Sequence, residues 1–287
     1  MRLIIGVVVI LGCVIGGYIA QGGHLAVLVQ PFEALIILGA AGGAFVIGNT
    51  GPVLKQTGSV FGILFKGPRY NKAAYIELLG LQFSLFKLVQ SKGILALEAH
   101  IENPHESAIF NNFPTFMKDH HAVEFMCDYL RMVTLGTRNQ HEMEALMDEE
   151  LETHHQEQER LVSAIQSLAD GTPALGIVAA VLGVIHTMGS ISEPPEVLGH
   201  LIGGALVGTF LGVLLAYGFF GPMAQGLKNI FEAESKYYIS MKVGLLAHIS
   251  GYAPAIAIEF ARKALMSEVR PSFTEIDEAT SNLPSLA

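Results

Sequence analysis

Charged residues are scarce in this sequence, and four long stretches lack them altogether. Only 15% of the 287 residues are Asp, Glu, Lys or Arg, whereas 51% are hydrophobic. Residues 171–192 and 197–227 contain no charge, and each stretch is long enough to cross a hydrocarbon core as a helix at about 1.5 Å per residue. Pro194 and Pro195 lie between them and cannot continue a helix, so the pattern predicts a transmembrane hairpin.

Other absences exclude several classes of protein. The net charge is −9 and no basic stripe offsets it, so nucleic acid is not an expected partner. The sequence has no nucleophile elbow, no phosphate-binding loop and no catalytic dyad in its apolar stretches, so neither an enzyme nor an organic cofactor is expected. The two cysteines, Cys13 and Cys127, lie in an apolar and a polar region, which argues against a disulfide between them.

A metal site is also not expected, although histidines gather in the polar middle of the chain. Adjacent histidines on a helix point about 100° apart and cannot readily share a metal, and the HExxH spacing is absent. The five histidines are His120, His121, His141, His154 and His155.

A second hairpin is expected at the N-terminus. Residues 3–32 and 34–54 carry no formal charge, and the expected spans are 3–20 and 32–48, with Pro31 at the start of the second helix. A removable signal peptide is the alternative interpretation. The first run is long for the apolar part of a signal peptide and a second span follows at once, so the hairpin is favoured.

The positive charges predict the orientation of the four spans. Residues 51–160 carry ten Lys or Arg and residues 228–270 carry six, whereas the loops at 21–31 and 191–199 carry none. By the positive-inside rule the middle region, the tail and both termini are cytoplasmic. The expected segments are a transmembrane hairpin at 1–50, a cytoplasmic helical domain at 51–165, a second hairpin at 166–227, and a cytoplasmic helix and tail at 228–287.

The cytoplasmic parts are expected to be helical. Apolar residues recur three and four apart in 72–90 and 122–136, and the same pattern in 142–168 favours a helix that continues into the third span. One further helix is expected around 253–267, followed by a loose polar terminus. The fold class is therefore an all-α integral membrane protein with four spans, a large helical insert between spans two and three, and a C-terminal helix.

Several small and polar residues of the second hairpin are candidates for function. Small residues recur every fourth position in span four, which permits close helix packing. Pro173 opens the third span and Pro222 closes the fourth, either as a first-turn proline and a helix stop or as hinges. The hydroxyl of Thr209 either bonds its own helix backbone, as membrane threonines commonly do, or serves a function. The small residues of span four are Gly204, Gly208, Gly212 and Ala216.

The motifs resemble those of one family over nearly the whole chain. In order they are GGYIAQGG, LALEAHIENP, YLR, ALMDEELETH, GTPALGIVAAVLGVIH, VGTFLGVLLAYGFFGP, GYAPAIAIEFARKAL and RPSF. They are similar to the MotA family of bacterial flagellar motor stator subunits, which is related more distantly to the TolQ and ExbB energisers. Four spans with a large insert match MotA, whereas TolQ and ExbB have three.

The resemblance implies an ion-driven stator in the bacterial inner membrane. In that family a pentamer surrounds a dimer of the single-span partner MotB, and its cytoplasmic domains push on the rotor protein FliG. A charge at mid-membrane costs at least about 2.5–3.5 kcal/mol, and the spans of this chain carry none. The resemblance therefore implies that the proton carrier is an Asp of MotB.

The resemblance also implies roles for residues of the ion path. Pro173 and Pro222 match functionally important prolines, and Thr209 matches a channel-lining hydroxyl. Ala180 matches a position where sodium-type stators tend to carry Thr, so a proton is the expected coupling ion and sodium is less favoured. Tyr217 is a further polar residue of these spans and is grouped with them.

A second group of residues matches the rotor-facing surface. Glu98 matches a rotor-facing acid, and Glu150 matches another cytoplasmic acid of lesser effect. A family Arg is replaced by Gln90, with Lys87 and Lys92 nearby. Lys supplies the charge but not the bidentate fork of Arg, so Lys92 is the first candidate and Lys87 the alternative.

Three other functions stay open from the sequence. The first is a TolQ/ExbB-like energiser of outer-membrane transport, with a partner that resembles TolR or ExbD. The others are an intramembrane enzyme, which would need a catalytic dyad in the spans, and a structural scaffold.

Overall fold

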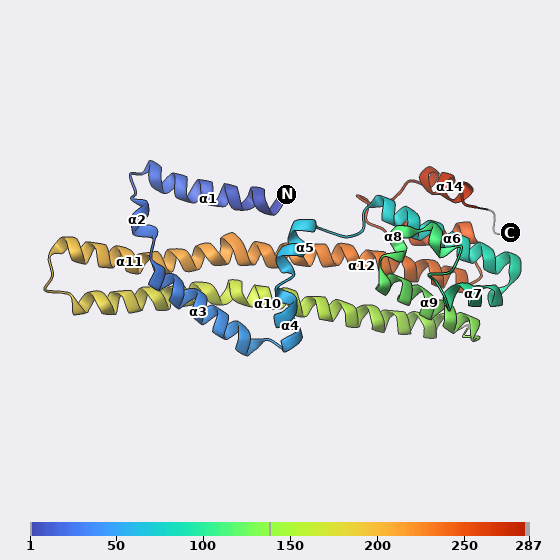
Figure 1. Ribbon diagram of the computed structural model, residues 1–287, viewed down its shortest axis with the longest axis horizontal. Helices are drawn as coiled ribbons and strands as arrows, with labels where there is room; N and C mark the ends of the chain where they lie inside the picture. The colour runs from blue at the N-terminus through green and yellow to red at the C-terminus, as the bar shows by residue number, and fades with distance from the viewer. Residues whose placement is uncertain (1, 138, 285–287) are drawn as a thin grey trace. The chain divides into compact units, whose positions relative to one another are not determined.

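The chain folds into helices joined by short turns. The computed structural model describes residues 2–137 and 139–284, and these contain no strand (Figure 1). The all-helical prediction is confirmed for them. Four helical stretches are long and apolar enough to cross a membrane, as the sequence predicts: Leu3–Ala20, Leu25–Gly48, Gln140–Gly189 and Pro195–Ile249.

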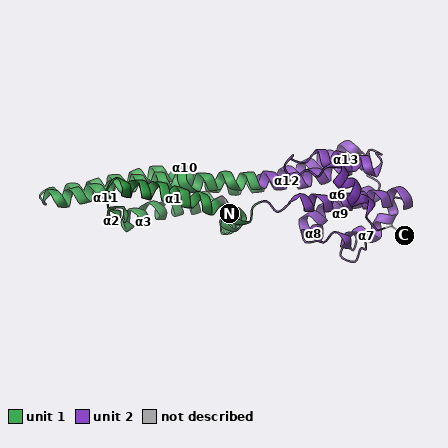
Figure 2. Cartoon of the chain, turned by 90° about the horizontal axis from the view of Figure 1, so that it is seen from above, with its two compact units in different colours: residues 1–67, 157–230 green, residues 68–156, 231–287 purple. Residues whose placement is uncertain are grey.

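The helices form two compact units (Figure 2). The first takes residues 1–67 and 157–230, and the second takes residues 68–156 and 231–287. Helices α10 (Gln140–Gly189) and α12 (Gly221–Ile249) contribute to both units. The division into four segments that the sequence predicts stays a prediction.

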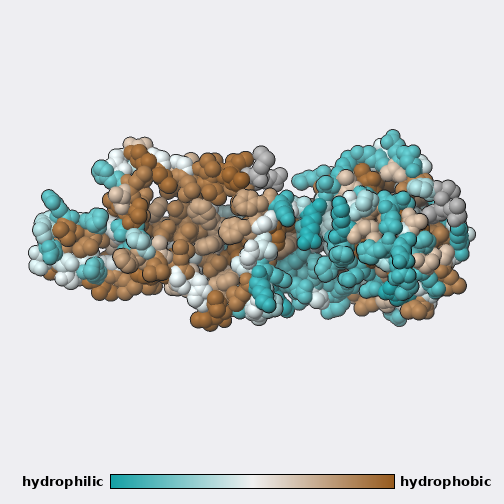
Figure 3. Space-filling model, viewed as in Figure 1, coloured by the Kyte–Doolittle hydropathy of each residue, from teal (hydrophilic) through white to brown (hydrophobic). Residues whose placement is uncertain are grey.

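The N-terminal hairpin of the first unit matches its predicted boundaries closely. The helices are α1 (Arg2–Ala20), α2 (Leu25–Leu28), α3 (Pro31–Gly48), α4 (Gly51–Thr57) and α5 (Val60–Lys66). Pro31 is the first residue of α3, where its missing N–H costs no helical hydrogen bond. Hydrophobic side chains cover the surface of this unit in Figure 3, as expected of helices that face lipid or other subunits.

The second hairpin is built from longer helices than the spans alone. The third span is the C-terminal part of α10, so the predicted continuation of the cytoplasmic helix into the span is confirmed. The fourth span consists of α11 (Pro195–Val213) and the π-helical segment η3 (Leu214–Phe220), and α12 follows directly. Pro173 lies inside α10, and Pro222 has helix on both sides. Pro173 is therefore not a first-turn proline, and Pro222 does not stop its helix.

The second unit has its own hydrophobic core. Tyr75, Leu78 and Phe86 of α6 are fully buried in this core, together with Phe110 and Tyr237. The side chains of Asn71 and Asp119 cap α6 and α9 by accepting the N–H of Ala74 and Ala122. The amphipathic helices predicted for this region are thus confirmed. The helices are α6 (Lys72–Lys92), η1 (Ile94–Leu97), α7 (Glu98–Ile101), η2 (Phe110–Asn112), α8 (Pro114–Met117), α9 (His120–Thr134), α13 (Pro254–Lys263) and α14 (Phe273–Ser281).

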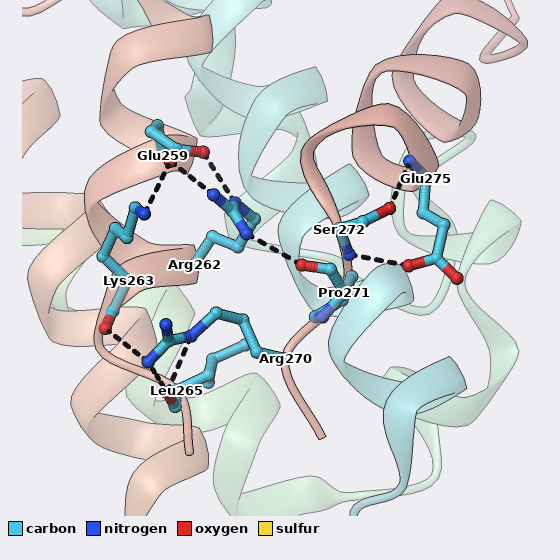
Figure 4. Close-up of polar contacts among 8 residues, drawn as sticks. All are labelled: Glu259, Arg262, Lys263, Leu265, Arg270, Pro271, Ser272 and Glu275. Carbon is cyan, nitrogen blue, oxygen red and sulfur yellow. Dashed lines mark hydrogen bonds and ion pairs between the residues drawn. The ribbon is translucent and has the colours of Figure 1, made fainter. Parts of the chain in front are cut away.

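The C-terminal region holds two helices rather than the one predicted. Ser272 and Glu275 form a capping box that starts α14 (Figure 4). The Glu275 carboxylate also pairs with Lys72 Nζ at 2.7 Å, which attaches α14 to α6. Arg262 donates to the Glu259 carboxylate and to the Pro271 carbonyl oxygen at 2.9 Å, so the chain between α13 and α14 is fixed.

One buried histidine gives the second unit a predicted pH dependence. The His248 ring stacks on Phe86 with centroids 4.2 Å apart, its Nδ1 has no hydrogen-bond partner, and burial lowers its pKa from 6.5 to about 4. Between these values the unfolded chain binds more protons than the folded chain, so the free energy of unfolding falls as pH falls from about 6.5 to 4, by up to about 3 kcal/mol. Melting followed by circular dichroism between pH 7 and pH 4 measures this slope.

His248→Phe is the matched control, because an aromatic ring at this position can still stack on Phe86 without titrating. The variant should lose melting temperature less steeply toward pH 4 than the unmodified chain. Equal slopes for the two proteins would show that His248 does not contribute.

Candidate functional site

The third and fourth spans meet along a seam of small residues. A Cβ added to Gly212 would lie 2.8 Å from the Cα of Gly176 and 2.9 Å from the carbonyl oxygen of Thr172. A Cβ added to Gly183 would lie 2.7 Å from the Cβ of Ala205. The two backbones are therefore in contact, and the close packing predicted from the small residues is confirmed.

Two predicted ion-path residues lie at one level of this seam. A Cβ added to Gly208 would lie 3.2 Å from the backbone nitrogen of Ala180 and 3.1 Å from the Cβ of Ala179. Thr209 is the next residue of α11 and is half-buried. The structure therefore brings Ala180 and Thr209 to neighbouring positions on facing helices.

The hydroxyl of Thr209 differs from the other threonines of the hairpin. Thr172 donates to the carbonyl oxygen of Leu168, and Thr187 donates to that of Gly183 at 2.9 Å, so both bond their own helix. Within the described residues Thr209 makes no such bond. The backbone-bonding interpretation is thus wrong for Thr209, whose hydroxyl keeps its donor and acceptors for another group.

The two prolines also lie near one level. A Cβ added to Gly221 would lie 3.2 Å from the carbonyl oxygen of Ala216 and 3.9 Å from the Cβ of Ala169. Ala169 lies one turn before Pro173 on α10, and Pro222 directly follows Gly221. The α-helical hydrogen-bond ladders of two adjacent helices are therefore interrupted close to each other, where bending is easiest.

Pro222 explains the π-helical segment η3 that precedes it. Proline has no N–H, and its ring clashes with the carbonyl four residues earlier, here that of Gly218. An α-helix cannot continue unchanged through this point, and widening to the π pattern over Leu214–Phe220 admits the proline without ending the helix. Tyr217 lies in this segment with 74% of its surface exposed. The sequence analysis did not find η3.

The hairpin can form a wall for an ion path but cannot itself carry a proton. No Asp, Glu, Lys or Arg occurs in 171–192 or 197–227. Its hydroxyl groups can donate and accept hydrogen bonds, but they do not titrate near neutral pH. A proton carrier in this path has to come from another chain.

The predicted rotor-facing residues cluster around one turn of the second unit. Gln90 and Lys92 end α6, and Glu98 starts α7; all three side chains are exposed. Gly93 has a φ of +85° and donates its N–H to the carbonyl oxygen of Val89 at 2.9 Å, which ends α6. Only glycine adopts this conformation readily, so Gly93 sets the path between the two groups.

The two lysine candidates have different surroundings. The Nζ of Lys87 lies 5.7 Å from the centroid of the Phe83 ring, one turn back on its own helix. Burial and the positive charge of Lys92 lower the pKa of His100, which lies on α7 with Glu98. The charge of Lys92 is therefore felt on the helix that carries Glu98.

Glu150 has a partner inside the second unit. Its carboxylate accepts a hydrogen bond from the hydroxyl of Tyr129, which joins α10 to α9. Burial of Tyr129 and this carboxylate raise the pKa of the phenol. Glu150 thus stabilises the packing of the unit, a contact that the sequence analysis missed because its members lie far apart in the chain.

The residues that could ligate a metal remain scattered. Among the described residues no three His, Cys, Asp or Glu side chains gather as a metal site. Cys13 is exposed on α1, and Cys127 is buried in α9.

Comparisons with known proteins agree over most of the chain. The family model described as Motility protein A N-terminal matches residues 4–93, and that of the MotA/TolQ/ExbB proton channel family matches residues 118–240. The chain is 46% identical to Motility protein A of Escherichia coli (strain K12) over 278 residues, covering 97% of this chain and 94% of that protein. It is 34% identical to the chemotaxis protein LafT of Vibrio parahaemolyticus over 278 residues, covering 97% and 98%.

Two solved structures share the fold. The structure of C. jejuni MotAB matches with a TM-score of 0.77 at 21% identity and covers 94% of this chain and 97% of that one. The flagellar MotAB stator complex from Bacillus subtilis matches with a TM-score of 0.71 at 26% identity and covers 89% and 92%.

Proposed function

Because this chain belongs to the MotA/TolQ/ExbB proton channel family, we propose that it is the ring-forming stator subunit of a bacterial flagellar motor. In this function it couples proton flow to torque on the rotor. The observation that carries the proposal is the charge-free seam of spans three and four, which exposes a hydroxyl but has no proton carrier.

The partner is a single-span subunit of the MotB type that supplies the membrane Asp. Solved relatives are MotAB complexes, which supports this pairing. The proposed assembly is a pentamer of this chain around a partner dimer in the bacterial inner membrane. Both termini of this chain are cytoplasmic, as the distribution of Lys and Arg favours.

The mechanism uses the partner's carboxylate as the moving charge. A proton from the periplasm neutralises the Asp, which changes its preference among the faces lined by Thr209 and Ala180. Each proton is worth about 2.3 kcal/mol per 100 mV of membrane potential, enough to bias one step of the ring. No hydroxyl occupies position 180, which supports a proton rather than sodium as the coupling ion.

The step reaches the rotor through the continuous helices. Pro173 and Pro222 permit bending of α10 and α12, and both helices continue into the second unit. There Glu98 and Lys92 engage oppositely charged groups of FliG. Gln90 leaves the surface without the Arg fork of the family, so Lys92 supplies a less directional contact.

An energiser of the TolQ/ExbB type is the alternative, and it has less support. The match to the Motility protein A N-terminal model covers residues 4–93, which include the first two candidate spans. A TolQ-like protein has three spans rather than four.

The test is complementation of a strain that lacks its own stator subunit. The chain is expressed with a MotB-type partner that carries either its membrane Asp or Asn, and swimming is measured in sodium-free medium. We expect swimming only with Asp, and we expect its speed to fall as external pH rises. Failure to swim with the intact partner, or dependence on sodium, would contradict the proposal.

A further inference from the structure

A groove of about 470 Å³ lies within the first unit and has no place in the mechanism above. It runs between α10 and the bend from α3 to α4. Ala41, Phe45 and Leu175 line it with apolar surface. Arg160 and Ser163 line it as well, so one groove combines hydrocarbon with a cation and a hydroxyl.

The lining changes from apolar to polar along the groove. Leu175 lies in the charge-free stretch of the third span, and Arg160 lies about 22 Å from it along the helix at 1.5 Å per residue. On the other wall α3 runs in the opposite direction, from Ala41 to its end at Gly48. Both walls therefore place their polar residues at the end nearer the cytoplasmic segments. This is the order of groups in a phospholipid, an acyl chain followed by a phosphate.

The polar end presents groups that lack partners. Within the described residues Arg160 forms no ion pair and no hydrogen bond, and the hydroxyl of Ser163 forms no hydrogen bond either. They lie three residues apart, on one face of α10. Arginine binds phosphate oxygens through two parallel N–H groups, and a neighbouring hydroxyl adds a third donor.

The charge of the lining selects the kind of lipid. Arg160 is the one charged residue that lines the groove in the described chain, and no Asp or Glu lines it. An ammonium headgroup would find no carboxylate there, whereas a lipid with net negative charge leaves Arg160 neutralised. We propose that the groove binds an anionic phospholipid of the cytoplasmic leaflet, with its phosphate on Arg160 and an acyl chain along Phe45 and Leu175.

The experiment uses the full chain co-expressed and purified with a MotB-type partner. Retained lipid is counted by native mass spectrometry, and thermal shifts are measured with phosphatidylglycerol, phosphatidylethanolamine and inorganic phosphate. We expect retention of phosphatidylglycerol and the largest shift with it. Arg160→Gln should weaken that binding about tenfold or more, because a charged hydrogen bond is lost.

Two further variants separate the headgroup from the acyl chain. Lys55→Gln removes a positive charge on α4 outside the groove and should leave binding unchanged. Ala44→Phe fills the apolar part of the groove without a change of charge, and it should also reduce retention.

Three outcomes would overturn the proposal. Equal shifts with both lipids would remove the charge selection, and an equal shift with inorganic phosphate alone would make this a free-phosphate site. If no lipid is retained and Arg160→Gln prevents assembly of the ring, a second copy of the chain covers the groove instead.

Discussion

Replacing Gly212 with valine is expected to abolish swimming and to deplete the assembled complex from the membrane. A Cβ at this position would lie 2.8 Å from the Cα of Gly176 and 2.9 Å from the carbonyl oxygen of Thr172. Both neighbours are backbone atoms, so no side chain can rotate away. Overpacking of this kind typically costs about 1–3 kcal/mol even where side chains can adjust, and here α10 and α11 have to separate.

The measurement is the amount of this chain that purifies with its partner, together with swimming speed. Gly199→Val is the matched control on the same helix, because nothing lies within 4 Å of a Cβ added there. It should assemble and swim normally. Normal assembly of Gly212→Val would show that the seam does not hold the hairpin together.

The spans were predictable because lipid imposes a simple composition. The expected limits of 3–20 and 32–48 differ by one residue at most from the helices Arg2–Ala20 and Pro31–Gly48. A hydrocarbon core excludes charge over about 20 residues, and Pro31 is suited to a first turn. Here local composition and global fold give the same answer.

The π-helical segment was not predictable from the same information. Leu214–Phe220 is as apolar as the α-helix before it, so hydropathy does not distinguish the two. The cause is Pro222, whose position the sequence shows but whose effect depends on whether the helix ends or widens. Contacts with α10 favour a continuous helix, and a single sequence does not reveal them.

Helix α14 illustrates a signal that was present in the sequence. Ser272 and Glu275 have the spacing of a capping box, and the structure contains both of its hydrogen bonds. Polar composition alone favours a loose terminus, and that expectation was wrong because the cap and the Lys72 pair offset it. A local cap was more informative here than average composition.

The candidate site divides in the same way. The types and spacing of small residues predicted the seam between spans three and four, because close packing needs only the absence of bulk. The difference between Thr209 and Thr187 depends on side-chain geometry that spacing does not specify. The link between Glu150 and Tyr129 is a tertiary contact, which one sequence without relatives does not reveal.

Replacing Pro173 with alanine is expected to leave the complex assembled and to remove most of its torque. Alanine restores the N–H that can bond the carbonyl of Ala169, and it favours the helix by about 3 kcal/mol relative to proline in a helix interior. The variant helix is therefore more stable but stiffer. If bending at this level drives each step, Pro222→Ala should have the same effect on the neighbouring helix.

The measurement is rotation of tethered cells, which works under high load, with the amount of membrane complex determined in parallel. Pro31→Ala is the matched control, since Pro31 occupies the first turn of α3 and its missing N–H interrupts no hydrogen bond. Hydrogen exchange across residues 165–175 separates stiffening from misfolding, because a stiffer helix exchanges more slowly and a misfolded one faster. Normal rotation of Pro173→Ala at a normal protein level would mean that the step is transmitted without bending of α10, and the small-residue seam would then be the remaining element able to move.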